Sequence, residues 1–140
     1  MLFRFIVAGV IVWGAFAANA GALADPASAR MFKGKTAQGH RIMLVVRQRA
    51  FRIHSFRVDL RCRDGSPLLL EESGFLWTKV GTNGRFRDAQ FGRTDSVYFR
   101  GRLTERRLRG RLRVTDKLRG GVRCRSRWIP FNATPPGRRT

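Results

Sequence analysis

The chain has 140 residues, a length that predicts a single domain with one hydrophobic core. It carries 29 lysines and arginines against 9 aspartates and glutamates, so its formal net charge is +20 at pH 7. Such a charge favours anionic partners, including nucleic acid, phosphorylated lipid and acidic polysaccharide, and it implies nothing about the fold.

The first 24 residues have the pattern of an export signal that is removed before folding. Arg4 precedes an unbroken apolar run over residues 5–18, and a cluster of small residues follows it. Cleavage after Ala20 or after Ala24 fits the small-x-small rule, and we prefer the second site. The protein would then be secreted or periplasmic in a bacterium. The alternative is an uncleaved anchor, since residues 5–24 are about long enough to span a bilayer.

Behind the signal, residues 25–30 read as a linker, residues 31–133 as a β-domain and residues 134–140 as a tail that does not pack. In the β-domain, apolar residues alternate with polar ones at period two, and clusters of Gly, Asn or Asp interrupt the pattern. The predicted strands cover residues 31–35, 41–47, 51–63, 68–71, 75–80, 85–91, 96–103, 107–115 and 122–131. Eight or nine short antiparallel strands predict an all-β fold, either a sandwich or an up-and-down barrel.

Local signals refine these strands. The inward set of residues 51–63 changes phase, which predicts a β-bulge near His54 and Ser55. The pair Asn83-Gly84 predicts a hairpin that joins residues 75–80 to residues 85–91. The inward-phase glycines Gly101 and Gly110 are expected to make room for a bulky neighbour such as Trp128. Trp77, Trp128 and the phenylalanines are predicted to lie in the core.

The two cysteines, Cys62 and Cys124, are predicted to form a disulfide, because an exported protein folds in an oxidising compartment. Neither cysteine belongs to a CxxC pair, and the two histidines, His40 and His54, fall in separate segments. The sequence therefore predicts no metal site.

Three C-terminal segments resemble a loose group of small secreted bacterial all-β proteins. In that group a V-x-G-x-F/L strand and a G-x-L-R strand precede a cysteine and a nearby tryptophan. The matching segments here are residues 97–103, 108–113 and 124–128, together with residues 32–36. The resemblance implies the β-fold and the disulfide. Because the group has no established activity, the resemblance implies no chemistry.

Alternation along the last strands turns a set of arginines outward, onto one predicted arginine face. Its members are Arg100, Arg102, Arg107, Arg109, Arg111, Arg113, Arg123, Arg125 and Arg127. Like charges on neighbouring strands repel, so this face needs salt, counter-ions or a bound polyanion, and arginine suits bidentate capture of phosphate or carboxylate. The alternative is a solvated exterior that only keeps the protein soluble.

The sequence contains no nucleophile elbow, phosphate-binding loop or zinc-binding histidine pair, so we predict no enzymatic activity and no cofactor. Glu71 and Glu72 are adjacent on a strand, so their side chains point to opposite faces.

The predicted partner is a polyanion, either lipopolysaccharide, acidic polysaccharide or nucleic acid bound without sequence preference. Only Tyr98 is predicted to be both aromatic and outward, which leaves little surface for stacking bases. The alternative function is a small secreted or periplasmic inhibitor of an enzyme. The sequence leaves the oligomeric state open.

Overall fold

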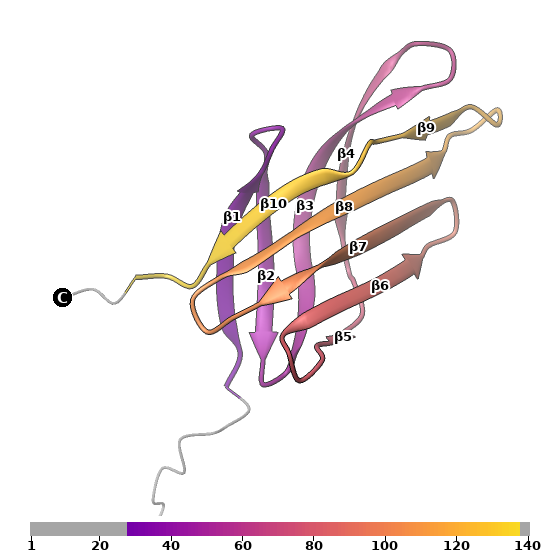
Figure 1. Cartoon of the computed structure of the whole chain (residues 1–140). Coiled ribbons are helices and arrows are strands. Elements are labelled where there is room, and N and C mark those ends of the chain that lie inside the picture. The colour runs from indigo at the N-terminus through magenta and orange to yellow at the C-terminus, as the bar shows by residue number, and fades with distance from the viewer. Residues whose placement is uncertain (1–27, 138–140) are drawn as a thin grey trace, which may run out of the picture.

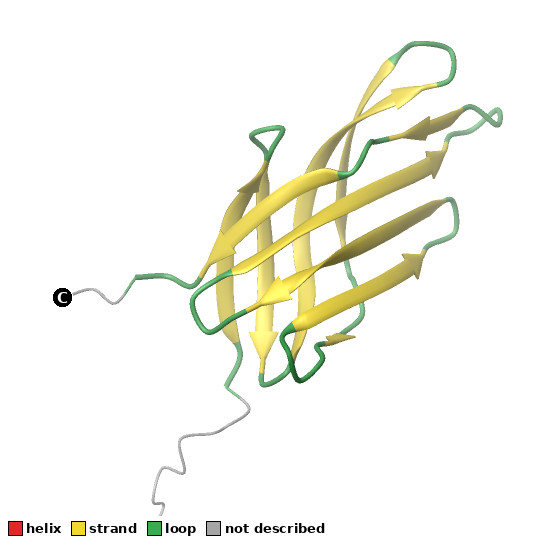
Figure 2. Cartoon of the chain, viewed as in Figure 1, coloured by secondary structure: helices red, strands yellow, loops and turns green. Residues whose placement is uncertain are grey.

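The computed structural model describes residues 28–137, and the predicted signal of residues 1–24 lies outside this part. The described chain forms ten strands and no helix (Figure 1, Figure 2). They are β1 (Arg30–Thr36), β2 (Arg41–Arg47), β3 (Ala50–Cys62), β4 (Pro67–Ser73), β5 (Thr78–Lys79), β6 (Arg85–Phe91), β7 (Asp95–Leu103), β8 (Leu108–Lys117), β9 (Arg123–Arg125) and β10 (Ile129–Thr134). The described residues accordingly include no helix that could cross a membrane.

The strands form one antiparallel sheet that closes on itself. Closure occurs because β10 pairs with both β1 and β8, while β9 pairs with both β3 and β8. The strands β1, β2, β3, β9, β8 and β10 make a closed barrel; β7 and β6 extend it beyond β8, and β4 and β5 extend it from β3. In Figure 1, β10, β8, β7 and β6 cross obliquely in front of β1, β2 and β3.

The predicted all-β, antiparallel class is therefore confirmed. The strand order departs from an up-and-down barrel, because β9 and β10 pair with strands that are distant in the sequence. There are ten strands instead of eight or nine, since one predicted strand is broken in two.

The long strand β3 is shared by several partners. One edge of it pairs with β2 and then with β9, and the other edge pairs with β5 and β4. Opposite β2 the register skips His54, since Met43 pairs with Ser55 and Leu44 pairs with Ile53. The β-bulge predicted at this place is thus confirmed, and bulges of this kind bend a strand around a barrel.

The core lies between the two layers of strands. Phe51 of β3 packs edge-on against Phe86 of β6 and Phe99 of β7, with ring centroids 4.6 and 5.8 Å apart. The largest fully buried side chains are Phe32, Phe51, Phe56, Phe99, Ile42, Leu44, Ile53, Leu108, Leu112, Val58, Val97 and Val114. Burial of each such side chain contributes roughly 1.5–3 kcal/mol, so this core holds β6 and β7 against β3 although they lie outside the closed ring.

The predicted strand of residues 122–131 is broken between β9 and β10. At the break, the Ser126 N–H donates to the Val114 carbonyl oxygen, and the Ser126 hydroxyl accepts from the Val114 N–H, both at 2.9 Å. Ser126 and then Ile129 are buried, so the inward phase shifts by one residue between them. The shift turns Trp128 to the outer face, and its predicted place in the core was wrong.

The second predicted core tryptophan is also outside. The short strand β5 pairs with β3, where Thr78 lies opposite Phe51. The turn at Asn83-Gly84 connects β5 to β6, but these two strands do not pair, so the predicted hairpin was wrong. Because the chain before β5 runs over the surface, Trp77 is 41% exposed, with the Arg52 guanidinium 5.2 Å from its ring centroid.

Closure of the barrel requires a glycine at position 34. Gly34 of β1 lies opposite Ala133 of β10, and a Cβ there would run into the backbone oxygen of Asn132. Gly34→Ala is expected to destabilise the fold by roughly 1–3 kcal/mol, as overpacking does elsewhere, in urea unfolding. Gly137→Ala is the control, since a Cβ at Gly137 meets none of residues 28–137 within 4 Å. An equal loss in both variants would contradict the explanation.

Candidate anion-binding sites

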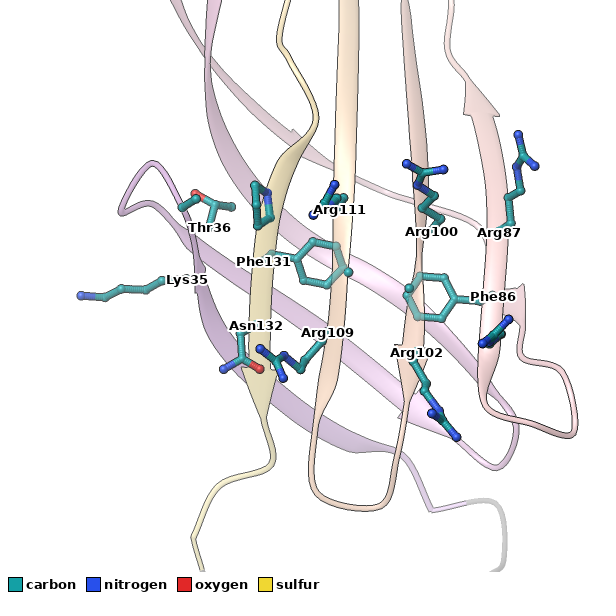
Figure 3. A pocket seen from close by; sticks show the side chains of 15 residues that line it. Lys35, Thr36, Phe86, Arg87, Arg100, Arg102, Arg109, Arg111, Phe131 and Asn132 are labelled. Atoms are coloured by element: carbon teal, nitrogen blue, oxygen red, sulfur yellow. The ribbon is translucent and has the colours of Figure 1, made fainter.

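Two rows of outward basic side chains cross strands β6, β7, β8 and β10 and reach the end of β1. The strand register places Arg85, Arg102, Arg109, Asn132 and Lys35 in the first row, and Arg87, Arg100, Arg111 and Pro130 in the second. A shallow groove lies between the rows, and none of the described residues that line it carries a carboxylate. Figure 3 shows Arg111, Arg100 and Arg87 on one side of the groove and Arg109 and Arg102 on the other. We call this feature the arginine groove.

The floor of the arginine groove is backbone. Gly101 and Gly110 pair with each other in the row between the arginines, and the rings of Phe86 and Phe131 pack against them (Figure 3). A Cβ at Gly110 would lie 2.8 Å from Phe131 Cζ and 2.6 Å from the Arg100 carbonyl oxygen. The glycines thus make room for a bulky neighbour as predicted, but that neighbour is a phenylalanine on each side and not Trp128.

Aromatic side chains accompany the arginines on the outer face. The guanidinium carbons of Arg100 and Arg113 lie 4.8 and 5.1 Å from the ring centroid of Trp128, and Arg113 also lies 5.2 Å from the ring of Tyr98. These are cation–π distances, so the rings offset part of the repulsion between the guanidinium groups. Phe91 is exposed and meets Tyr98 edge-on at 5.8 Å. The prediction that Tyr98 is the only outward aromatic residue was wrong.

The nine predicted arginines are divided between two surfaces. The arginine groove contains Arg100, Arg102, Arg109 and Arg111, while Arg113, Arg123, Arg125 and Arg127 line a separate cleft. Arg107 lies exposed in the turn after β7 and lines neither. Sequence reasoning missed Lys35, Arg85 and Arg87 in the groove, although Arg85 and Arg87 flank the apolar Phe86 with the same period-two spacing.

The separate cleft lies over the Cys62 to Cys124 disulfide, which the structure contains as predicted. We call it the disulfide cleft. Six arginines line it, namely Arg61, Arg63, Arg113, Arg123, Arg125 and Arg127. Cys62 pairs with Cys124 in the ladder between β3 and β9, and the adjacent pair is Arg61 with Arg125.

The disulfide is strong enough to hold these like charges together. Closing a loop between cysteines 62 residues apart stabilises the fold by roughly 4 kcal/mol. A like-charge pair directly opposite on two strands costs on the order of 1 kcal/mol. The covalent bond therefore outweighs the repulsion that it creates.

Carboxylates neutralise few of the arginines. Within residues 28–137, Arg57 is the one arginine that forms an ion pair with a carboxylate. Its Nε lies 2.9 Å from Glu71 Oε2. Asp59 lies beside His40, with 2.7 Å between its Oδ2 and the His40 Nε2, and the Thr78 hydroxyl donates to Asp88 at 2.7 Å. The positive field over both arginine sites is therefore not cancelled by neighbouring acids.

Three other carboxylates face one another at the edge of the core. Glu72 of β4 approaches Asp95 of β7 and Asp116 of β8. Partial burial raises the pKa of Glu72 to about 7, and the negative charges of Asp95 and Asp116 add to the rise. Glu71, one residue earlier, points away to Arg57, as alternation along the strand requires.

This cluster makes stability depend on pH. The pKa of Glu72 is raised from 4.5 in the unfolded chain to about 7 in the folded chain. As the pH rises from about 4.5 to 7, the carboxyl group therefore loses its proton in the unfolded chain while it keeps it in the folded chain. The free energy of unfolding falls over this pH range. Glu72→Gln is expected to raise the melting temperature near pH 8 and to leave it nearly unchanged near pH 4. Thermal melts followed by circular dichroism at the two pH values test this. An equal rise at both would assign the effect to packing.

In comparisons with known proteins, no family model matches this chain, and no curated protein or solved structure is significantly similar to it. Among residues 28–137 no three His, Cys, Asp or Glu side chains are placed to hold a metal ion.

Proposed function

We propose that this chain is an exported, non-catalytic β-domain that binds an anionic component of the bacterial envelope or another polyanion, such as an acidic polysaccharide or lipopolysaccharide. The main observation in support of this proposal is the arginine groove. Within residues 28–137 its two rows contain seven basic side chains and no carboxylate. The basic residues are Lys35, Arg85, Arg102 and Arg109 in one row and Arg87, Arg100 and Arg111 in the other.

The spacing of the rows suits an extended polymer. Neighbouring strands lie about 4.8 Å apart, and outward residues on one strand lie about 7 Å apart. The groove is thus about 19 Å long from β6 to β1, and a polymer lying along it would meet a guanidinium group on both sides at β6, β7 and β8. Guanidinium groups bind carboxylate, sulfate and phosphate in bidentate fashion. An exterior that serves solubility alone needs the charge but not this order.

The test is a salt titration of binding. Affinities for lipopolysaccharide, heparin and single-stranded DNA are measured at several salt concentrations, and steep linear falls of log K with log salt support polyanion binding. Tightest binding to single-stranded DNA would instead favour the outward rings of Trp128, Tyr98 and Phe91 as stacking surfaces. Affinities that do not depend on salt would contradict the proposal.

One loop favours a second candidate function, inhibition of an enzyme. Leu76 is 73% exposed and its neighbour Trp77 is 41% exposed. The Leu76 backbone is fixed because its N–H donates to Gln90 Oε1 at 2.7 Å and its carbonyl accepts from Gln90 Nε2 at 3.0 Å. A fixed loop that presents an apolar side chain can fill a pocket of an enzyme at low entropic cost. Such binding would survive moderate salt and would not require the arginine groove.

A further inference from the structure

We infer that the disulfide cleft is a second binding site, for a ligand that carries clustered phosphate groups. The inference goes beyond the proposed function, because the cleft is lined by different arginines from those of the groove and takes a compact ligand instead of a linear polymer.

The disulfide imposes the arrangement of charges. Both cysteines stand between two arginines, as Arg61-Cys62-Arg63 and Arg123-Cys124-Arg125. In the antiparallel ladder Arg61 is paired with Arg125, and on the other side of the disulfide the Arg63 N–H donates to the Arg123 carbonyl oxygen at 2.8 Å. Because the two cysteines are buried, alternation turns all four arginines to the outer face. Four guanidinium groups are therefore held around one covalent bond.

The described residues around these four arginines add two cations and one carboxylate. The cations are Arg113 and Arg127, and Asp59 is the one acid among the described residues that line the cleft. The Asp59 carboxylate lies 2.7 Å from His40, and the Asp59 backbone N–H and carbonyl are both bonded to the side-chain amide of Gln38, at 2.8 and 3.0 Å. Asp59 is thus bound by the turn after β1 and forms no ion pair with an arginine among residues 28–137, so the arginines are left for an external anion.

The cleft also offers apolar surface. Leu60 and Ile129, each nearly fully buried, lie beneath it, and Pro67 and Trp128 line it. A ligand with an organic part attached to its phosphates can therefore make contacts that a free ion cannot. Phosphate fits the site because its terminal oxygens accept hydrogen bonds from several guanidinium groups at once. A soluble phosphate ester and the headgroup of a phosphorylated lipid share this chemistry.

Calorimetric titration of the full chain with inorganic pyrophosphate, at fixed ionic strength, tests the site. Binding is expected, and R61Q/R125Q is expected to weaken it about 100-fold, since it removes two charge-assisted contacts. R63Q/R123Q is expected to do the same. The matched control is R47Q/R49Q, which removes two exposed arginines at the opposite end of β3 and is expected to leave pyrophosphate binding within about twofold of the unchanged chain.

A second titration uses phosphatidylcholine vesicles that contain phosphatidic acid. If pyrophosphate binds, the ligand is a soluble phosphate. If only the vesicles bind, the ligand is a lipid headgroup. In both cases R61Q/R125Q must reduce the affinity. No binding to either probe, or equal losses in the cleft and control variants, would overturn the inference. A groove variant that lacks Arg85, Arg87, Arg102 and Arg109 is expected to keep pyrophosphate binding, so failure of the groove and failure of the cleft are distinguishable.

Discussion

Replacing Arg85, Arg87, Arg102 and Arg109 together by glutamine is expected to weaken binding to lipopolysaccharide or heparin about 1000-fold at physiological salt. Each basic residue near an anionic surface contributes about 1 kcal/mol, and about 1.4 kcal/mol corresponds to a factor of ten. The slope of log K against log salt should also fall by about three, at roughly 0.7–0.9 for each lost contact, by analogy with nucleic acid. Isothermal titration at several salt concentrations measures both quantities.

These four arginines are suitable because all are exposed and none makes an ion pair or stacks on an aromatic ring in the described part of the chain. Stability is therefore expected to stay level or to rise, since repulsion between neighbouring strands is relieved.

The matched control replaces Arg41, Arg47, Arg49 and Arg119, which are equally exposed and lie outside the groove. If the control variant loses as much affinity as the groove variant, net charge alone determines binding and the order of the two rows has no role. The arginine groove would then be an exterior that serves solubility.

Local patterns in the sequence predicted most of the strands, because each of those patterns depends on near neighbours. The period-two alternation of β2 and β6 gave their observed bounds, and the phase change in β3 predicted its bulge. The strand 122–131 could not be predicted as two pieces, since its break depends on hydrogen bonds between Ser126 and Val114, twelve residues away. That one break decided whether Trp128 lies in the core or on the outer face.

Contacts between distant segments also determine which arginines share a site. Alternation shows which arginines point outward, but it cannot show which strands become neighbours. The one predicted face is therefore divided between a groove that crosses β6, β7, β8 and β10 and a cleft between β3 and β9. The repeated Arg-Cys-Arg pattern was a signal for the cleft, since a disulfide between its two copies brings the flanking arginines together. The approach of Glu72 to Asp95 and Asp116 joins three distant segments and leaves no local signal.

Replacing both Cys62 and Cys124 by alanine is expected to destabilise the fold by roughly 4 kcal/mol, because the unfolded chain regains the freedom of a long loop. For a domain of this size the melting temperature should fall by about 15 °C or more. The β signature in far-ultraviolet circular dichroism should persist below the transition, since the barrel core does not depend on the cysteines. A fall of only a few degrees would mean that the loop is already constrained in the unfolded chain.

Salt separates the covalent contribution from the electrostatic one. In the alanine variant, β3 and β9 are joined only by their short strand pairing, and Arg61 and Arg125 repel each other across it. The strand β9 is therefore expected to separate from β3 more easily at low salt. Raising the salt concentration screens this repulsion, since the Debye length falls from about 10 Å at 0.1 M to about 3 Å at 1 M. The alanine variant should therefore gain more stability from salt than the disulfide-bonded chain does. Adding R61Q/R125Q to the alanine variant should reduce its gain in stability from salt to that of the disulfide-bonded chain. If the alanine variant gains the same stability from salt with and without these two arginines, the disulfide does not restrain their repulsion.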